Sequence, residues 1–151
     1  MQKRVVRGLP GYIIAFVAMS APFAMAAMNS GVTVDLKDAS VGGSLTGMQI
    51  IPSQTAMKAG EIAFSVTNRS ATLVHEMIVV KLDKQGEMLP YDVNEDKVDE
   101  DRIKSLGEVS ELDPGKTGTL RVKLAPGVYA LLCNQRGHYH AGMVTAITVT
   151  R

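Results

Sequence analysis

The chain has 151 residues, of which 46% are hydrophobic and 21% are charged. This length suits one domain with one hydrophobic core and excludes two, so we look for a single site. The formal net charge of +1 gives no indication of a nucleic acid or an anionic membrane surface as a partner.

The first 26 residues have the pattern of a secretory signal peptide. Three basic residues among the first seven precede an apolar stretch that ends at Met19, and the small-x-small pattern Ala24-Met25-Ala26 follows. A retained membrane anchor is the alternative, but it needs about 20 apolar residues, and Ser20 and Pro22 interrupt the stretch too early. We therefore predict a signal peptide over residues 1–26, a mature domain over residues 27–151, and a periplasmic location without membrane insertion.

Alternation of apolar and polar residues dominates the mature part, and this pattern is typical of half-buried strands. The predicted strands cover 32–37, 62–67, 77–82, 120–124, 128–133 and 144–150. Turn-forming residues separate them at 58–60, 68–70, 84–86, 113–115 and 125–127. Short strands at this spacing predict an all-β fold, an antiparallel sandwich or barrel.

One strongly charged segment, residues 92–104, breaks this alternation, and Val93, Val98 and Ile103 are its only apolar residues. We expect a short helix or a solvated loop between strands. Its acidic residues could dock a basic partner, but basic residues are interleaved with them, so a solvated face is the favoured interpretation.

Cys133 is the only cysteine of a chain that we expect to be exported, where cysteines usually occur in disulfide pairs. A buried, inert thiol would be the simple interpretation. However, His138 follows Cys133 by five residues, and Met143 follows His138 by five. Thiolate, thioether and imidazole ligands together suit copper. A trigonal copper site needs a second histidine, and His75, at the start of the predicted strand 77–82, is the candidate.

Two stretches carry a resemblance to a known family. Residues 126–143, PGVYALLCNQRGHYHAGM, and residues 57–68, MKAGEIAFSVTN, followed by His75, resemble the cupredoxins. The ligand-loop spacing is similar to that of rusticyanin and auracyanin, and residues 74–81, VHEMIVVK, look like periplasmic copper-resistance cupredoxins. The resemblance implies a Greek-key β-sandwich with one type 1 copper ion, three equatorial ligands and one axial ligand. These are His75, Cys133 and His138 in the equatorial plane and Met143 in the axial position.

Two residues depart from the better-known members of this family. Glu76 stands where Asn or Asp often braces the cysteine loop, so it could brace the loop differently or approach the metal. His140 lies two residues beyond His138 and could compete with Met143, although a loop histidine is more often exposed to solvent.

No general base or substrate pocket is evident, so we expect a one-electron carrier, not an enzyme. It would be a monomer that exchanges electrons with a redox partner protein. The alternative is copper handling, for resistance, storage or delivery to a copper-trafficking protein, with further methionines as soft ligands. These are Met28, Met48, Met57, Met77 and Met88. A purely structural interaction module would leave Cys133 unexplained.

Overall fold

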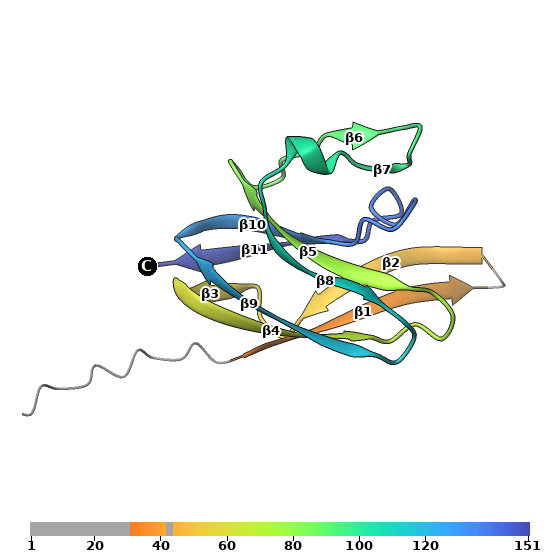
Figure 1. Ribbon diagram of the computed structural model, residues 1–151, viewed down its shortest axis with the longest axis horizontal. Helices are drawn as coiled ribbons and strands as arrows, with labels where there is room; N and C mark the ends of the chain where they lie inside the picture. The colour runs from red at the N-terminus through yellow and green to blue at the C-terminus, as the bar shows by residue number, and fades with distance from the viewer. Residues whose placement is uncertain (1–30, 42–43) are drawn as a thin grey trace, which may run out of the picture.

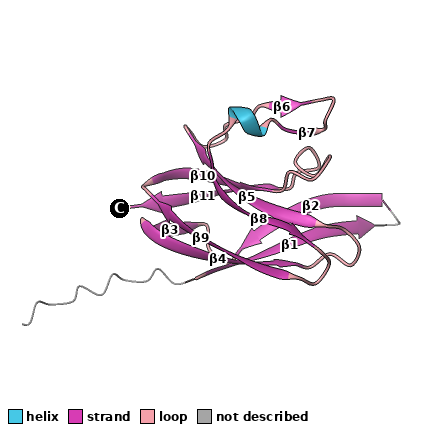
Figure 2. Ribbon diagram, in the orientation of Figure 1, coloured by secondary structure: helices cyan, strands magenta, loops and turns pink. Residues whose placement is uncertain are grey.

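The computed structural model describes residues 31–41 and 44–151, so the predicted signal peptide lies outside the described residues. Eleven strands in this part of the chain form two sheets, packed face to face, and a small separate hairpin (Figure 1). Strands and loops account for nearly all of it, with one short 3-10 helix (Figure 2). No helix in the described residues has the length and apolar character needed to span a membrane.

The first sheet consists of β1 (Val32–Val41), β2 (Ser44–Pro52), β4 (Gly60–Asn68) and β9 (Thr117–Leu124), in the order β2-β1-β4-β9. The second consists of β3 (Ala56–Lys58), β5 (His75–Leu82), β8 (Ser105–Leu112), β10 (Gly127–Leu132) and β11 (Val144–Thr150), in the order β3-β11-β10-β5-β8. The predicted all-β sandwich is confirmed, but its sheets are mixed and not purely antiparallel, because β1 pairs in parallel with β4 and β11 with β3.

Alternating residues of both sheets form the core between them. In β1 and β4, which pair in parallel, Val32 lies opposite Phe64 and Val34 opposite Val66, and all four side chains are fully buried. Since side chains of a strand alternate between its two faces, the polar residues between these four point away from the core. The same core includes Cys133 and places it at the boundary between the sheets and the loop beyond β10.

A second apolar cluster explains why residues 77–82 read as a nearly continuous apolar run. Met77 and Val79 face the main core, while Ile78 and Val80 face a smaller cluster on the outer side of the second sheet. A strand covered on both faces loses the alternation of a half-buried strand. The cover comes from residues 89–103, which contribute Leu89, Val98 and Ile103 among others.

The charged segment 92–104 belongs to this cover. With Tyr91 it forms the hairpin of β6 (Tyr91–Asp92) and β7 (Lys97–Val98), followed by a 3-10 helix over Glu100–Arg102. Val98 is buried and Val93 is exposed, so the hairpin turns one apolar side toward the sheet. The segment is therefore more than a solvated face, because it packs on β5 and β10.

Gly118 of β9 marks a close approach between the two sheets. A Cβ atom at this position would lie 2.4 Å from Cγ1 of Val109 in β8, and Val109 is stiff because it is β-branched. We expect Gly118→Ala to lower the free energy of unfolding by about 1–3 kcal/mol through overpacking. Chemical denaturation of Gly31→Ala is the control, since a Cβ there meets its nearest neighbour at an ordinary 3.6 Å. Equal stability of the two variants would contradict this packing.

Candidate metal centre

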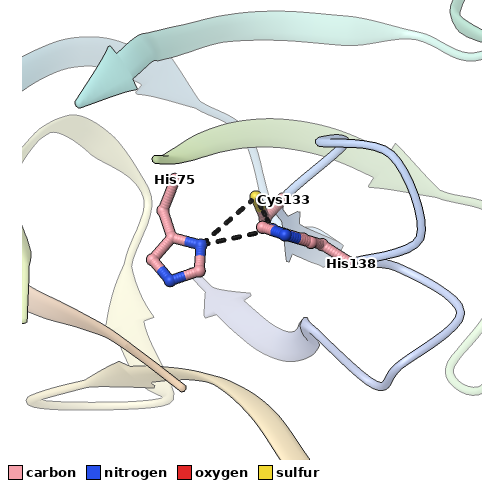
Figure 3. A group of neighbouring side chains, drawn as sticks. All are labelled: His75, Cys133 and His138. Carbon is pink, nitrogen blue, oxygen red and sulfur yellow. Dashed lines mark hydrogen bonds between the residues drawn. The ribbon is translucent and has the colours of Figure 1, made fainter. Parts of the chain in front are cut away.

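Three side chains converge on one another, one from the start of β5 and two from the loop after β10 (Figure 3). The Nδ1 atoms of His75 and His138 are 3.2 Å apart, and the Sγ atom of Cys133 lies 4.0 Å from the first and 3.4 Å from the second. His75 and Cys133 are fully buried, whereas His138 is half-buried. Three potential ligand atoms therefore face a common point.

Strand pairing brings His75 and Cys133 together. His75 is the first residue of β5, and Cys133 directly follows β10. The two strands are antiparallel neighbours, with Ile78 opposite Leu132, so the start of one lies beside the end of the other. This confirms the expected meeting of the strand start with the cysteine loop.

The loop after Cys133 folds back on itself. The N–H of Cys133 donates to the carbonyl of Met143 at 3.0 Å, and the N–H of Met143 donates to the carbonyl of His138 at 2.9 Å. The tight path passes through Gly137, whose φ of 80° favours glycine. These bonds hold the backbone of Met143 against the backbones of Cys133 and His138, and the Met143 side chain is fully buried.

Burial sets the protonation of the cluster. It lowers the pKa of His75 and of His138 from the usual value, so both imidazoles are neutral at pH 7 and each has a lone pair to donate. Burial also raises the pKa of the Cys133 thiol to about 11, so the thiol keeps its proton until a metal cation replaces it. One thiolate and two imidazoles, with a thioether adjacent in the loop, form a donor set that fits copper.

His140 stands apart from this cluster. Among the described residues, the group of His, Cys, Asp and Glu side chains that could hold a metal comprises His75, Cys133 and His138. His140 is exposed, and its ring lies edge-on to Tyr91 with a centroid distance of 5.6 Å.

The other methionines differ in exposure. Met48, Met57 and Met77 are buried in the core, Met88 is 85% exposed, and Met28 lies outside the described residues. Core methionines usually fill gaps in packing. Of the four described ones, Met88 alone is open to a metal from solvent.

Comparison with known proteins agrees with this geometry. The sequence profile described as "Copper binding proteins, plastocyanin/azurin family" matches residues 37–150. The chain belongs to this family. No curated protein matches the chain in sequence.

Several solved cupredoxins share the fold. Sodium-dithionite-reduced auracyanin from Roseiflexus castenholzii has 19% identity and a TM-score of 0.56, with 82% of this chain and 99% of that chain covered. Auracyanin B has 20% identity and a TM-score of 0.52, with coverage of 82% and 91%. Rusticyanin from Thiobacillus ferrooxidans has 16% identity and a TM-score of 0.55, with coverage of 80% and 77%. The predicted family and fold are thus confirmed, and copper is the cofactor that the family and the three-residue cluster indicate.

Glu76 braces the cysteine loop of this cupredoxin. Its backbone N–H points at Sγ of Cys133 at 3.5 Å, and its Oε1 accepts the N–H of Asn134 at 3.0 Å. Glu76 is 9% exposed, and burial raises the pKa of its carboxyl group. The hydrogen bond to Asn134 supports one of the two roles considered for Glu76, that of bracing the cysteine loop.

Asn134 connects the same loop to the β6–β7 hairpin, a link that the sequence pattern did not predict. Its Oδ1 accepts the N–H of Val98 at 2.7 Å, and its Nδ2 donates to the carbonyl of Val98 at 3.0 Å and to Oε1 of Glu100 at 2.7 Å. The N–H of Gly137 also donates to the carbonyl of Asp96 at 2.8 Å. The hairpin therefore holds the outer side of the loop that carries Cys133 and His138.

We expect Asn134→Ala to lower the free energy of unfolding by about 2–4 kcal/mol, because it leaves buried polar groups of Val98 and the Glu100 carboxylate without this partner. Denaturant titration measures the loss. Asn94→Ala, an exposed position in the same hairpin, is the matched control and should change stability little. A loss no greater than that of the control would show that the hairpin does not anchor the loop.

Proposed function

We propose that this cupredoxin is a one-electron carrier whose copper would be held by His75, Cys133, His138 and Met143. The observation that carries the proposal is the convergence of two Nδ1 atoms and one Sγ atom within 4.0 Å of one another in a buried setting. When bound, copper supplies the one-electron couple between Cu(I) and Cu(II).

The chain's own residues limit rearrangement of the site. β5 fixes His75, β10 fixes Cys133, and the turn from His138 to Met143 is closed by the backbone bond between them. Glu76 and Asn134 hold the loop from the inner and the outer side. Because ligands that cannot move cost little reorganisation between oxidation states, this rigidity supports rapid electron transfer.

Exchange with a redox partner protein would take place over the ligand loop. His138 is half-buried and lies in the loop, so its ring edge is the part of the cluster nearest to solvent. Beyond it lies an apolar hollow of the surface. Its lining residues are Met88, Leu89, Tyr91, Tyr139, His140 and Val144. We infer that a partner docks on this side, and that the protein acts as a monomer and has no catalytic activity of its own.

Copper loading tests the function. The purified mature domain should bind one copper ion, show intense visible absorption when oxidised, give the electron paramagnetic resonance spectrum of a type 1 site, and cycle reversibly in voltammetry. Binding without these signals would contradict the carrier role. A periplasmic location is part of the proposal, supported by the signal-peptide pattern, and is checked by the N-terminal sequence of the exported protein, which should begin at Ala27.

Copper handling is the second candidate, favoured by one observation. Met88 offers an exposed thioether in the same hollow as His140, beside the ligand loop. Competition with a Cu(I) chelator separates the two functions. A carrier retains its copper through redox cycling, whereas a handling protein gives it up to the competitor.

A further inference from the structure

The second ring nitrogen of His75 faces a carboxylate on the other sheet. While Nδ1 of His75 points to Cys133 and His138, Nε2 lies on the opposite side of the ring (Figure 3). It is 3.7 Å from Oδ1 of Asp38 in β1, and the two side chains are 0% and 11% exposed. The carboxylate thus approaches the cluster from behind one of its proposed ligands.

Nε2 of His75 and Oδ1 of Asp38 are both buried, and neither makes a hydrogen bond within the described residues. Leaving a buried polar atom unpaired costs about 1–3 kcal/mol. At 3.7 Å the contact is longer than a hydrogen bond, but Oδ1 of Asp38 and Nε2 of His75 are the polar atoms that face each other there.

Asp38 is held in this position by the turn that precedes His75. Interaction with the Ser70 hydroxyl is the main reason that the pKa of Asp38 is lowered. Ser70 is fixed in turn, because its N–H donates to Oδ1 of the fully buried Asn68 at 2.9 Å and its hydroxyl accepts the N–H of Leu73 at 2.8 Å. β1 also breaks its register with β2 between Asp38 and Ser40, which redirects the strand at this residue.

We propose that Asp38 is a positioning residue for His75: its carboxylate accepts a hydrogen bond from the Nε2–H group and places a negative charge behind this imidazole. The proposal deepens the proposed function and rests on His75 as a copper ligand. Metal-binding histidines are commonly oriented by a carboxylate on their second nitrogen, which fixes the tautomer and makes the imidazole a stronger donor. Asp38 therefore keeps the lone pair on Nδ1 and favours Cu(II) over Cu(I).

Two substitutions of Asp38 separate the effect of its hydrogen-bond acceptor from the effect of its negative charge. Asp38→Asn keeps an oxygen acceptor and removes the charge, whereas Asp38→Leu removes both. Asp35→Asn is the matched control, since it removes the same charge from the same strand at a half-exposed residue that pairs with Arg69. The measurements are the tautomer of His75 by nitrogen NMR in the metal-free protein and the reduction potential after copper loading.

We expect His75 to be the Nε2–H tautomer in the wild type and in Asp38→Asn, and a mixture in Asp38→Leu. Asp38→Asn should lower the preference for Cu(II) over Cu(I) about tenfold, which raises the potential by about 59 mV, while Asp35→Asn should change it less than twofold. The proposal is wrong if Asp38→Leu keeps the Nε2–H form, or if Asp38→Asn shifts the potential no more than Asp35→Asn does.

Failure of the proposed function gives a different result. If the wild type showed no type 1 spectrum, the carrier role would be wrong. The tautomer of His75 in the metal-free wild type and Asp38→Leu proteins would still decide whether Asp38 positions the ring.

Discussion

Replacement of Cys133 by alanine is expected to abolish the visible colour of the copper-loaded protein. Intense absorption in a type 1 site comes from charge transfer between the cysteine thiolate and copper, and this chain has no second cysteine to take over. The same change should lower copper affinity by at least 100-fold, roughly 2.7 kcal/mol, because two imidazoles remain without their soft anionic partner. Visible spectroscopy and isothermal titration measure the two effects.

Cys133→Ser is the companion variant. It keeps nearly the same shape in the core, but a hydroxyl group does not lose its proton at neutral pH as a metal-bound thiol does, so it should also be colourless. Circular dichroism should show both variants folded, since Cys133 contributes only one of many buried contacts. An intensely coloured Cys133→Ala protein would overturn the assignment of the thiolate.

The sequence pattern could predict most of the candidate site because three of its four residues have a local signal. Cys133, His138 and Met143 lie on one loop at regular spacing, so no knowledge of the fold was needed to group them. His75 was harder, because it lies 58 residues before Cys133, and the inference required that the start of one strand lie beside the end of another. The pairing of β5 with β10 meets that requirement.

The surroundings of the site could not be predicted because they depend on contacts between segments that are distant in the sequence. Asp38 follows the predicted strand 32–37 and looks like an ordinary polar residue there, and only the packing of β1 against the turn before β5 brings it to His75. Asn134 acts through Val98 and Glu100, 36 and 34 residues away. In a segment of mixed charge such as 92–104, the pattern favours solvent exposure and carries no sign of this contact.

The two longest of the strands that the pattern did not predict, β2 and β8, escaped it for a physical reason. β8 lies at the edge of the second sheet, and Val109 is its only buried residue, so it lacks the alternation that marks a half-buried strand. β2 is likewise an edge strand, and of its described side chains Met48 and Ile50 are buried. Edge strands need fewer apolar residues because one side of each is solvated, and many carry charges that discourage aggregation.

Met143→Leu is expected to keep both copper and colour while it raises the reduction potential. Three equatorial ligands remain after the change, and leucine has nearly the volume of methionine, so the buried position should stay filled. A distant thioether donor stabilises Cu(II) more than Cu(I), and its loss therefore favours the reduced ion. We expect a rise of roughly 60 mV or more by voltammetry, and each 59 mV corresponds to about 1.4 kcal/mol.

The matched test is His140→Ala, which removes the other side chain considered for the axial position. His140 is exposed and its ring contacts Tyr91, so its loss should leave the reduction potential within about 10 mV of the wild type. This is far below the roughly 59 mV that corresponds to a tenfold change in the preference between Cu(II) and Cu(I). Met143, by contrast, is fully buried and tied through its backbone to both Cys133 and His138. A large shift for His140→Ala and none for Met143→Leu would overturn this assignment and make Met143 a core residue.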